Sequence, residues 1–178
     1  MKNCLTVAII FFCCCLFNIG CKTASSEKYF DLAVLNSNML VGFANMGQLR
    51  ELESPSVKLV ENSNQPVAMK RNEIIDQKIK FIETNLEKLK ELKVTTDTKD
   101  MLQTSLALYE FILPVYKMEY GQLARLYDEG ASNEKIQMQA QTINDKYYPH
   151  FNELYTRLIS IGKLYAERNS IKVNWGTQ

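Results

Sequence analysis

Apolar residues at helical spacing run through most of this chain and constrain its fold more than any other feature. Between Val67 and Lys93 the apolar positions advance alternately by four and three, at Ile75, Ile79, Ile82, Leu86 and Leu89. From about Thr98 to Glu129 the same step recurs at Leu102, Leu106, Tyr109, Leu113, Tyr116, Tyr120, Leu123 and Tyr127. Such spacing places the apolar side chains on one face of a helix. We therefore predict two long amphipathic helices over these ranges.

Two further segments have the same character, and together the four predict an all-α fold. Ser25 or Ser26 can cap a first helix, whose apolar positions are Leu32, Leu35, Met39, Phe43, Met46 and Leu49. Ser132 can cap a fourth, with a face at Ile136, Ala140, Ile143, Tyr147, Phe151, Leu154, Leu158, Ile161 and Tyr165. Helices of this length joined mainly by short turns predict an up-down-up-down antiparallel four-helix bundle over residues 28–169.

Breaks in the pattern define the connections. Residues 54–66 contain two prolines among serines and asparagines, which predicts a loop with at most a turn of helix. Residues 94–97 predict a turn with Thr96 or Asp97 as the N-cap of the third helix, and Gly130 is expected to end that helix. Nowhere is the β-type alternation long enough to predict a sheet. Residues 170–178 form a tail, whose alternating apolar residues suggest an extended arm against the bundle.

Three features inside the predicted helices modify them locally. Pro114 and Pro149 are each expected to kink a helix. Gly42 and Gly47 weaken helix propensity, and their small size would let a neighbouring helix approach closely.

The first twenty residues have the composition of an export signal. Lys2 supplies a positive start, and Leu5 to Phe17 form an apolar run of the length that signal peptides use. A membrane-spanning helix needs roughly 20 apolar residues, so this run is too short to span a bilayer. We predict a cleaved signal peptide over residues 1–20, with an uncleaved anchor as the alternative.

The end of this segment resembles the lipobox of bacterial lipoproteins. Asn18-Ile19-Gly20-Cys21 has the family's small residues and its cysteine, with Asn18 where leucine is commonest. The resemblance implies cleavage after Gly20 and a diacylglyceryl group on the Cys21 thiol, with further acylation such as palmitate on the new amine. Residues 21–27 would then be a lipidated tether. Lys22, in place of an aspartate, resembles the pattern of lipoproteins sorted to the outer membrane.

The body of the chain has a weaker resemblance of its own. Four helices behind a lipobox, together with the closing segment Tyr165 to Val173, resemble small helical envelope lipoproteins of uncharacterised function. The resemblance implies a fold and an envelope location but no site.

Composition excludes several function classes. Four of the five cysteines lie before Cys21, so the body has neither disulfides nor thiolate metal ligands. The 21 Lys and Arg nearly balance the 20 Asp and Glu, which disfavours a nucleic-acid partner.

Catalytic and cofactor sites also find little support. His150 is the single histidine, and a haem would need it together with an inward methionine such as Met39, Met46 or Met118. A di-iron bundle needs Glu-x-x-His motifs, and the chain has none. With no body cysteine and one histidine, an activated nucleophile is poorly supported. We expect no enzyme activity, no metal and no cofactor.

The tyrosines are the most unusual feature of the body. Tyr109, Tyr116 and Tyr120 share one predicted helix face, and Tyr147 is expected to lie opposite them. Buried tyrosines usually belong to the core and reach a partner with the hydroxyl. The alternative is a ring-lined ligand pocket where Pro114 and Pro149 bend adjacent helices. The leading hypothesis is a lipid-anchored helical module that binds a protein partner or acts structurally, and a carrier of a small hydrophobic or aromatic ligand is the alternative.

Overall fold

The computed structural model describes residues 24–60 and 65–175. Within these ranges the protein is mostly helical, as the sequence predicts, with one small sheet of two strands. The predicted signal peptide, the lipobox and Cys21 lie outside the described residues, as does the end of the tail after Trp175.

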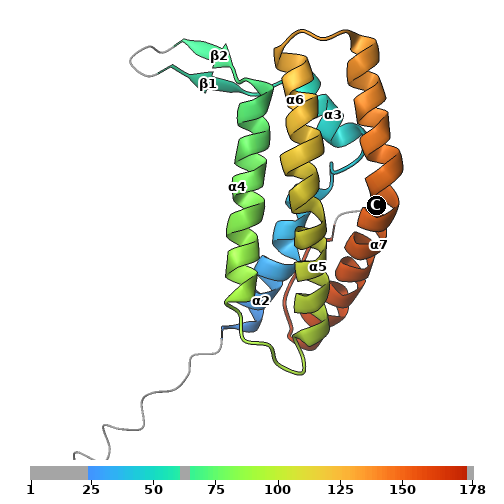
Figure 1. Cartoon of the computed structure of the whole chain (residues 1–178). Helices are drawn as coiled ribbons and strands as arrows, with labels where there is room; N and C mark the ends of the chain where they lie inside the picture. The colour runs from blue at the N-terminus through green and yellow to red at the C-terminus, as the bar shows by residue number, and fades with distance from the viewer. Residues whose placement is uncertain (1–23, 61–64, 176–178) are drawn as a thin grey trace, which may run out of the picture.

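The three long predicted helices are confirmed, and they pack side by side (Figure 1). Helix α4 spans Arg71–Lys90, and α7 spans Asn133–Arg168. The helix between them consists of α5 (Lys99–Val115), a π-helical turn η3 (Tyr116–Tyr120) and α6 (Gly121–Asp128). The π-turn begins two residues after Pro114, so the helix departs from regular α-geometry next to the proline. In contrast, α7 remains one α-helix on both sides of Pro149.

Most predicted helix ends are confirmed, and two are wrong. The second helix begins at Arg71 rather than near Val67, because residues 66–68 are extended and pair with residues 57–59. The Ser25 and Ser132 hydroxyls accept hydrogen bonds from Lys28 and Lys135 at the starts of α2 and α7, and Gly130 has a φ of +72° just after α6. The third helix, however, begins after Thr98 rather than after Thr96 or Asp97. Thr98 is held there because its hydroxyl accepts a hydrogen bond from the Thr95 amide at 2.9 Å.

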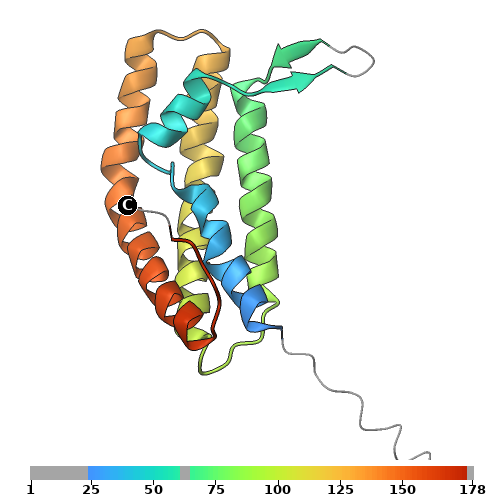
Figure 2. The same cartoon turned by 180° about the vertical axis from the view of Figure 1, so that it is seen from behind.

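The prediction of one continuous first helix is wrong. The segment consists of α2 (Ser26–Ala33), a 3-10 helix η2 (Leu35–Leu40) and α3 (Met46–Glu53), which together cover one side of the long helices (Figure 2). Gly42 and Gly47 explain the break, because a Cβ at Gly47 would lie 2.9 Å from the Gly42 Cα. The two glycines thus let the chain fold back on itself, whereas the sequence suggested contact with another helix.

The loop prediction for residues 54–66 is also wrong. Strands β1 (Val57–Leu59) and β2 (Pro66–Ala68) form an antiparallel hairpin, with Val57 opposite Ala68 and Leu59 opposite Pro66. The hairpin projects from the body beside the start of α4 (Figure 1). Pro66 is tolerated because it begins a strand that has a free edge.

The C-terminal arm is confirmed as far as Trp175. The Ile171 amide donates to the Ala166 carbonyl at 2.9 Å, which turns the chain back after α7. Trp175 then packs edge-on against Phe30 of α2, with 5.8 Å between ring centroids, and Lys163 of α7 lies over the same indole. The arm therefore links α7 to α2.

Candidate functional site

The predicted tyrosines are divided between the core and its margin. Tyr109 and Tyr116 are fully buried, Tyr120 is 3% exposed, and Tyr147 is half-buried. Tyr116 and Tyr120 stack with 4.8 Å between centroids, and both contact the ring of Phe43. Tyr147 lies away from this stack, where its hydroxyl donates to Glu119 at 2.9 Å. The structure thus brings Tyr116 and Tyr120 together and leaves Tyr147 apart.

The hydroxyls of the buried tyrosines differ in their partners. Tyr116 donates to the Gln48 carboxamide oxygen at 2.9 Å, and Gln48 in turn donates to Glu51 at 2.9 Å. Lys78 of α4 completes this chain with a 3.4 Å contact to Glu51. Tyr109 has no hydrogen-bond partner among the described residues.

Burial also controls the ionisation of these tyrosines. Loss of solvation raises the pKa of Tyr116 well above its ordinary value, and burial likewise raises the pKa of Tyr109 and of Tyr120. All three phenols therefore stay neutral at physiological pH and act through packing and hydrogen bonding rather than as bases.

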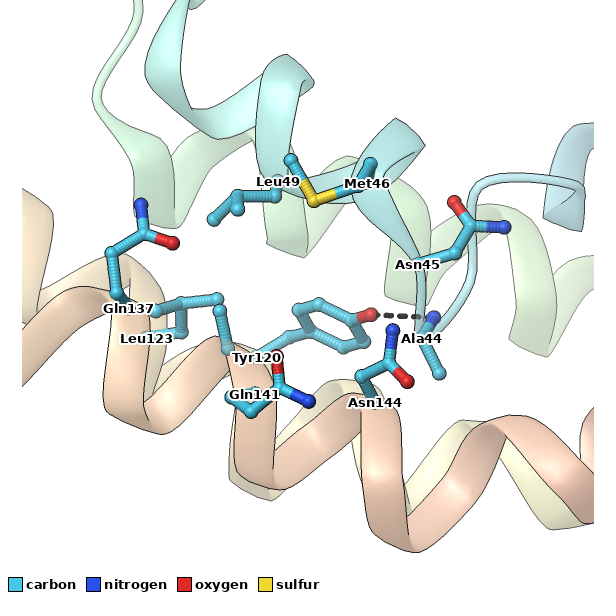
Figure 3. Close-up of a pocket in the computed structure, with 10 residues that line it drawn as sticks. Ala44, Asn45, Met46, Leu49, Tyr120, Leu123, Gln137, Gln141 and Asn144 are labelled. Atoms are coloured by element: carbon cyan, nitrogen blue, oxygen red, sulfur yellow. Dashed lines mark hydrogen bonds between the residues drawn. The ribbon is translucent and has the colours of Figure 1, made fainter.

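A small cavity opens where Tyr120 meets α3 and α7 (Figure 3). We call it the amide pocket, since four of its lining side chains are carboxamides. Its volume is about 40 Å³. It is lined by Ala44, Asn45, Met46, Leu49, Tyr120, Leu123, Gln137, Ala140, Gln141 and Asn144. Of the four tyrosines proposed as ligand-binding residues, Tyr120 alone lines it, and neither Pro114 nor Pro149 does.

The backbone at one end of the amide pocket is unusual. Ala44 is buried and has a φ of +50°, a left-handed conformation that is uncommon outside glycine. Its amide donates to the Tyr120 hydroxyl at 2.8 Å (Figure 3). Asn45 caps α3 next to it by accepting a hydrogen bond from the Gly47 amide at 2.7 Å. The break in the first helix therefore creates this pocket, which a continuous helix would have lacked.

The carboxamides of α7 are functional candidates that the sequence alone does not single out. Gln137, Gln141 and Asn144 advance by four and three residues, so they share one helix face beside the apolar one. That spacing was visible in the sequence. Its significance depends on the position of Ala44 and Asn45, which only the structure gives.

The hairpin carries a second candidate surface. Val57 and Leu59 are 66% and 68% exposed on one face of the hairpin, and we call these two residues the hairpin surface. Val67, 39% exposed, pairs with Lys58 and lies on the other face. A cavity of about 180 Å³ lies at the base of the hairpin. It is lined by Met39, Glu51, Ser56, Met69, Ile74, Gln77, Lys78 and Phe81. A contiguous exposed apolar patch, unlike a single exposed apolar side chain, often marks an interaction site.

The residues considered for metal or haem binding do not converge. Met39, Met46 and Met118 are 57%, 54% and 62% exposed, so none of them faces inward. His150 is exposed and lies 3.3 Å from Glu153. Across residues 24–60 and 65–175, no group of three or more His, Cys, Asp or Glu side chains is arranged to hold a metal ion.

No protein-family model, curated protein or solved structure matches this chain. In the part of the chain that the structure describes, no helix has both the length and the apolar character needed to cross a membrane.

Proposed function

We propose that the protein is a lipid-anchored binding module of the bacterial cell envelope, attached to the outer membrane through Cys21. Its body presents the hairpin surface to a protein partner. The lipobox-like sequence at Cys21 supports the anchor. One acyl chain binds a membrane only marginally, whereas two or three chains on one residue hold it stably.

The position of the hairpin relative to the chain's entry into the body carries the proposal. The Tyr29 hydroxyl donates to the Lys93 carbonyl at 2.7 Å, so the start of α2 lies beside the end of α4. The hairpin lies beside the start of α4, 20 residues earlier. At about 1.5 Å per helical residue, the two sites are separated by roughly 30 Å. The start of α2 and the hairpin thus lie at opposite ends of the body (Figures 1 and 2).

This separation suits an anchored module. A body held at residue 24 has its far end turned away from the membrane, where a partner can reach it. The finer architecture that we propose is an up-down-up-down bundle in which α2, η2 and α3 together take the place of the first helix. In such a bundle, each helix carries the chain from one end to the other.

The interior has little space for a bound ligand, which disfavours the alternative function of a hydrophobic-ligand carrier. Tyr109 and Tyr116 are fully buried, and Phe43 fills the space between Tyr116 and Phe151 with centroid distances of 5.6 and 4.9 Å. Pockets for small molecules usually measure about 300–1,000 Å³, several times the volume of the amide pocket. Packing of the tyrosine face therefore favours the binding module.

Metabolic labelling with a palmitate analogue tests the anchor. Wild-type protein should incorporate the label and fractionate with outer membranes, and Cys21→Ala should do neither. A substitution of Cys15, which lies in the predicted leader, is the matched control and should leave labelling intact. An unlabelled wild type, or a labelled Cys21→Ala protein, would refute the proposal.

A further inference from the structure

The amide pocket has a lining chemistry that differs from the rest of the surface. Charged residues make up 23% of the chain, yet all ten lining residues are uncharged. Met46, Leu49, Leu123 and Ala140 provide an apolar part, and the carboxamides and the Tyr120 hydroxyl provide a polar part. A neutral ligand with one apolar and one hydrogen-bonding portion matches this lining.

Hydrogen-bonding capacity is left over at the Tyr120 end of the pocket. The Tyr120 oxygen accepts from the Ala44 amide, but its own proton has no acceptor among the described residues. Asn144 is half-buried, and its carboxamide forms no hydrogen bond within residues 24–60 and 65–175. The Tyr120 hydroxyl is buried, and buried polar groups in folded proteins normally find partners, so its unused proton indicates a bound molecule or water at this end of the cavity.

The other carboxamides of the pocket are already engaged. The Asn45 nitrogen donates to the Val41 carbonyl at 2.8 Å, and Gln141 donates to Asp145 at 2.7 Å. Gln137 reaches Glu53 at 3.5 Å. Gln137 and Gln141 are exposed, so their remaining carboxamide groups face solvent, whereas the free groups of Tyr120 and Asn144 belong to less exposed side chains (Figure 3).

We propose that the amide pocket binds the acetamido group of an N-acetylated ligand. The carbonyl oxygen of that group would accept from the Tyr120 hydroxyl, and its N–H would donate to the Asn144 carboxamide oxygen. The methyl group would lie against Leu49, Leu123 and Ala140. A volume of about 40 Å³ suits a methyl with one planar amide, since a single water needs roughly 10–15 Å³ on this measure.

The ligand has two chemical sources, an N-acetylated sugar and an acetylated peptide, and one titration separates them. Full-length protein in detergent micelles, labelled with 13C at its methionine methyls, is titrated with N-acetylglucosamine and with N-acetylalanine methylamide. Met46 lines the pocket and reports binding, while Met138, 60% exposed and outside the pocket, serves as the reference. Glucosamine, which lacks the acetyl group, is the negative control.

We expect a saturable shift of the Met46 methyl with at least one N-acetylated probe, and none with glucosamine. Because the group bound is so small, the Kd should be on the order of millimolar. The probe that binds more tightly identifies the source, and equal binding would mean that the acetamido group alone is recognised.

Variants connect the shift to the proposed contacts. Asn144→Ala should weaken binding about tenfold, as should filling the pocket with Ala140→Leu, while Asn152→Ala on the exposed face of α7 should have no effect. An unsaturable Met46 shift, an equal shift at Met138, an equal response to glucosamine or unchanged binding by Asn144→Ala would each overturn the proposal.

Discussion

Two regions of the molecule use large apolar side chains in opposite ways. The aromatic cluster, formed by Phe43, Phe111, Tyr116, Tyr120 and Phe151, is held together by ring contacts between 4.8 and 6.2 Å. The hairpin surface has Val57 and Leu59 about two-thirds exposed. A two-stranded hairpin is only marginally stable alone, so these side chains contribute little to holding the fold.

The contrast separates residues needed for folding from residues free to serve function. Loss of a side chain in the aromatic cluster removes buried contacts and leaves a cavity. Loss of one in the hairpin surface removes little that is buried. The free energies of unfolding of matched variants therefore test this difference between the two regions.

The largest expected effect is that of Phe43→Ala. Phe43 is fully buried and contacts the other four rings of the cluster, so we expect a loss of about 3–5 kcal/mol in the free energy of unfolding. Leu59→Ala is the matched control and should change it by less than about 0.5 kcal/mol. Urea denaturation followed by circular dichroism measures both. Equal losses in the two variants would contradict the comparison.

A smaller effect is expected at Gly162, where α7 packs on α2. A Cβ there would lie 2.7 Å from the Val34 Cγ1, so Gly162→Ala should cost about 1–3 kcal/mol in the free energy of unfolding. Adding Val34→Ala should remove that clash. Gly121→Ala is the control, because its Cβ would meet only the Tyr116 carbonyl oxygen at 3.8 Å, and it should stabilise by about 0.5–1 kcal/mol. A thermal melt in which Gly162→Ala equals the wild type would refute the close packing.

Two tyrosines on the same helix face should respond differently to removal of the hydroxyl. Tyr116→Phe leaves the buried Gln48 oxygen unpaired and should cost about 1–3 kcal/mol. Tyr109 has no partner in the described structure, so Tyr109→Phe should leave the free energy of unfolding unchanged or raise it by up to about 1 kcal/mol. Chemical denaturation of the two variants, side by side, tests the difference. The reverse order would contradict the assigned hydrogen bond.

Alkaline pH should weaken the aromatic cluster in a predictable direction. Because burial raises the pKa of Tyr109, Tyr116 and Tyr120 in the folded protein, the unfolded chain releases these protons first. The stability they contribute is fully present below the ordinary tyrosine pKa of about 10, and above it falls by roughly 1.4 kcal/mol per pH unit for each group. Urea denaturation between about pH 9 and 11 measures the slope, which Tyr116→Phe should reduce. A flat profile would contradict the burial.

The sequence predicted the regular parts of this fold and missed the irregular ones. Sustained apolar spacing over residues 98–129 and 132–169 was sufficient to place α5, α6 and α7, because tertiary burial and helical period agree there. The prediction of one continuous first helix is wrong because the apolar spacing over residues 32–49 is as regular as that of the long helices. The Gly42–Gly47 contact that breaks the helix depends on chain geometry rather than on periodicity.

The candidate sites also divide into residues that periodicity identifies and residues that it does not. Each strand of the hairpin has three residues, which are too few for alternation to indicate β-structure, so the sequence predicts a loop there. The apolar spacing of the third helix is sufficient to identify Tyr120 as a candidate site residue. It does not identify Asn144, because a polar residue beside the apolar face of a helix is usually solvated. The proposed role of Asn144 depends on Ala44, which lines the same pocket.

Site-specific photocrosslinking in intact cells tests whether the hairpin surface binds a protein partner. A photoreactive residue at Leu59 of the hairpin surface is compared with one at Val94, 56% exposed, in the turn after α4 near the tether end. We predict one discrete protein adduct from Leu59 that Val57→Asp abolishes, and none from Val94. No adduct from Leu59, the same adduct from Val94, or an adduct insensitive to Val57→Asp would contradict a partner-binding hairpin at the end opposite the anchor.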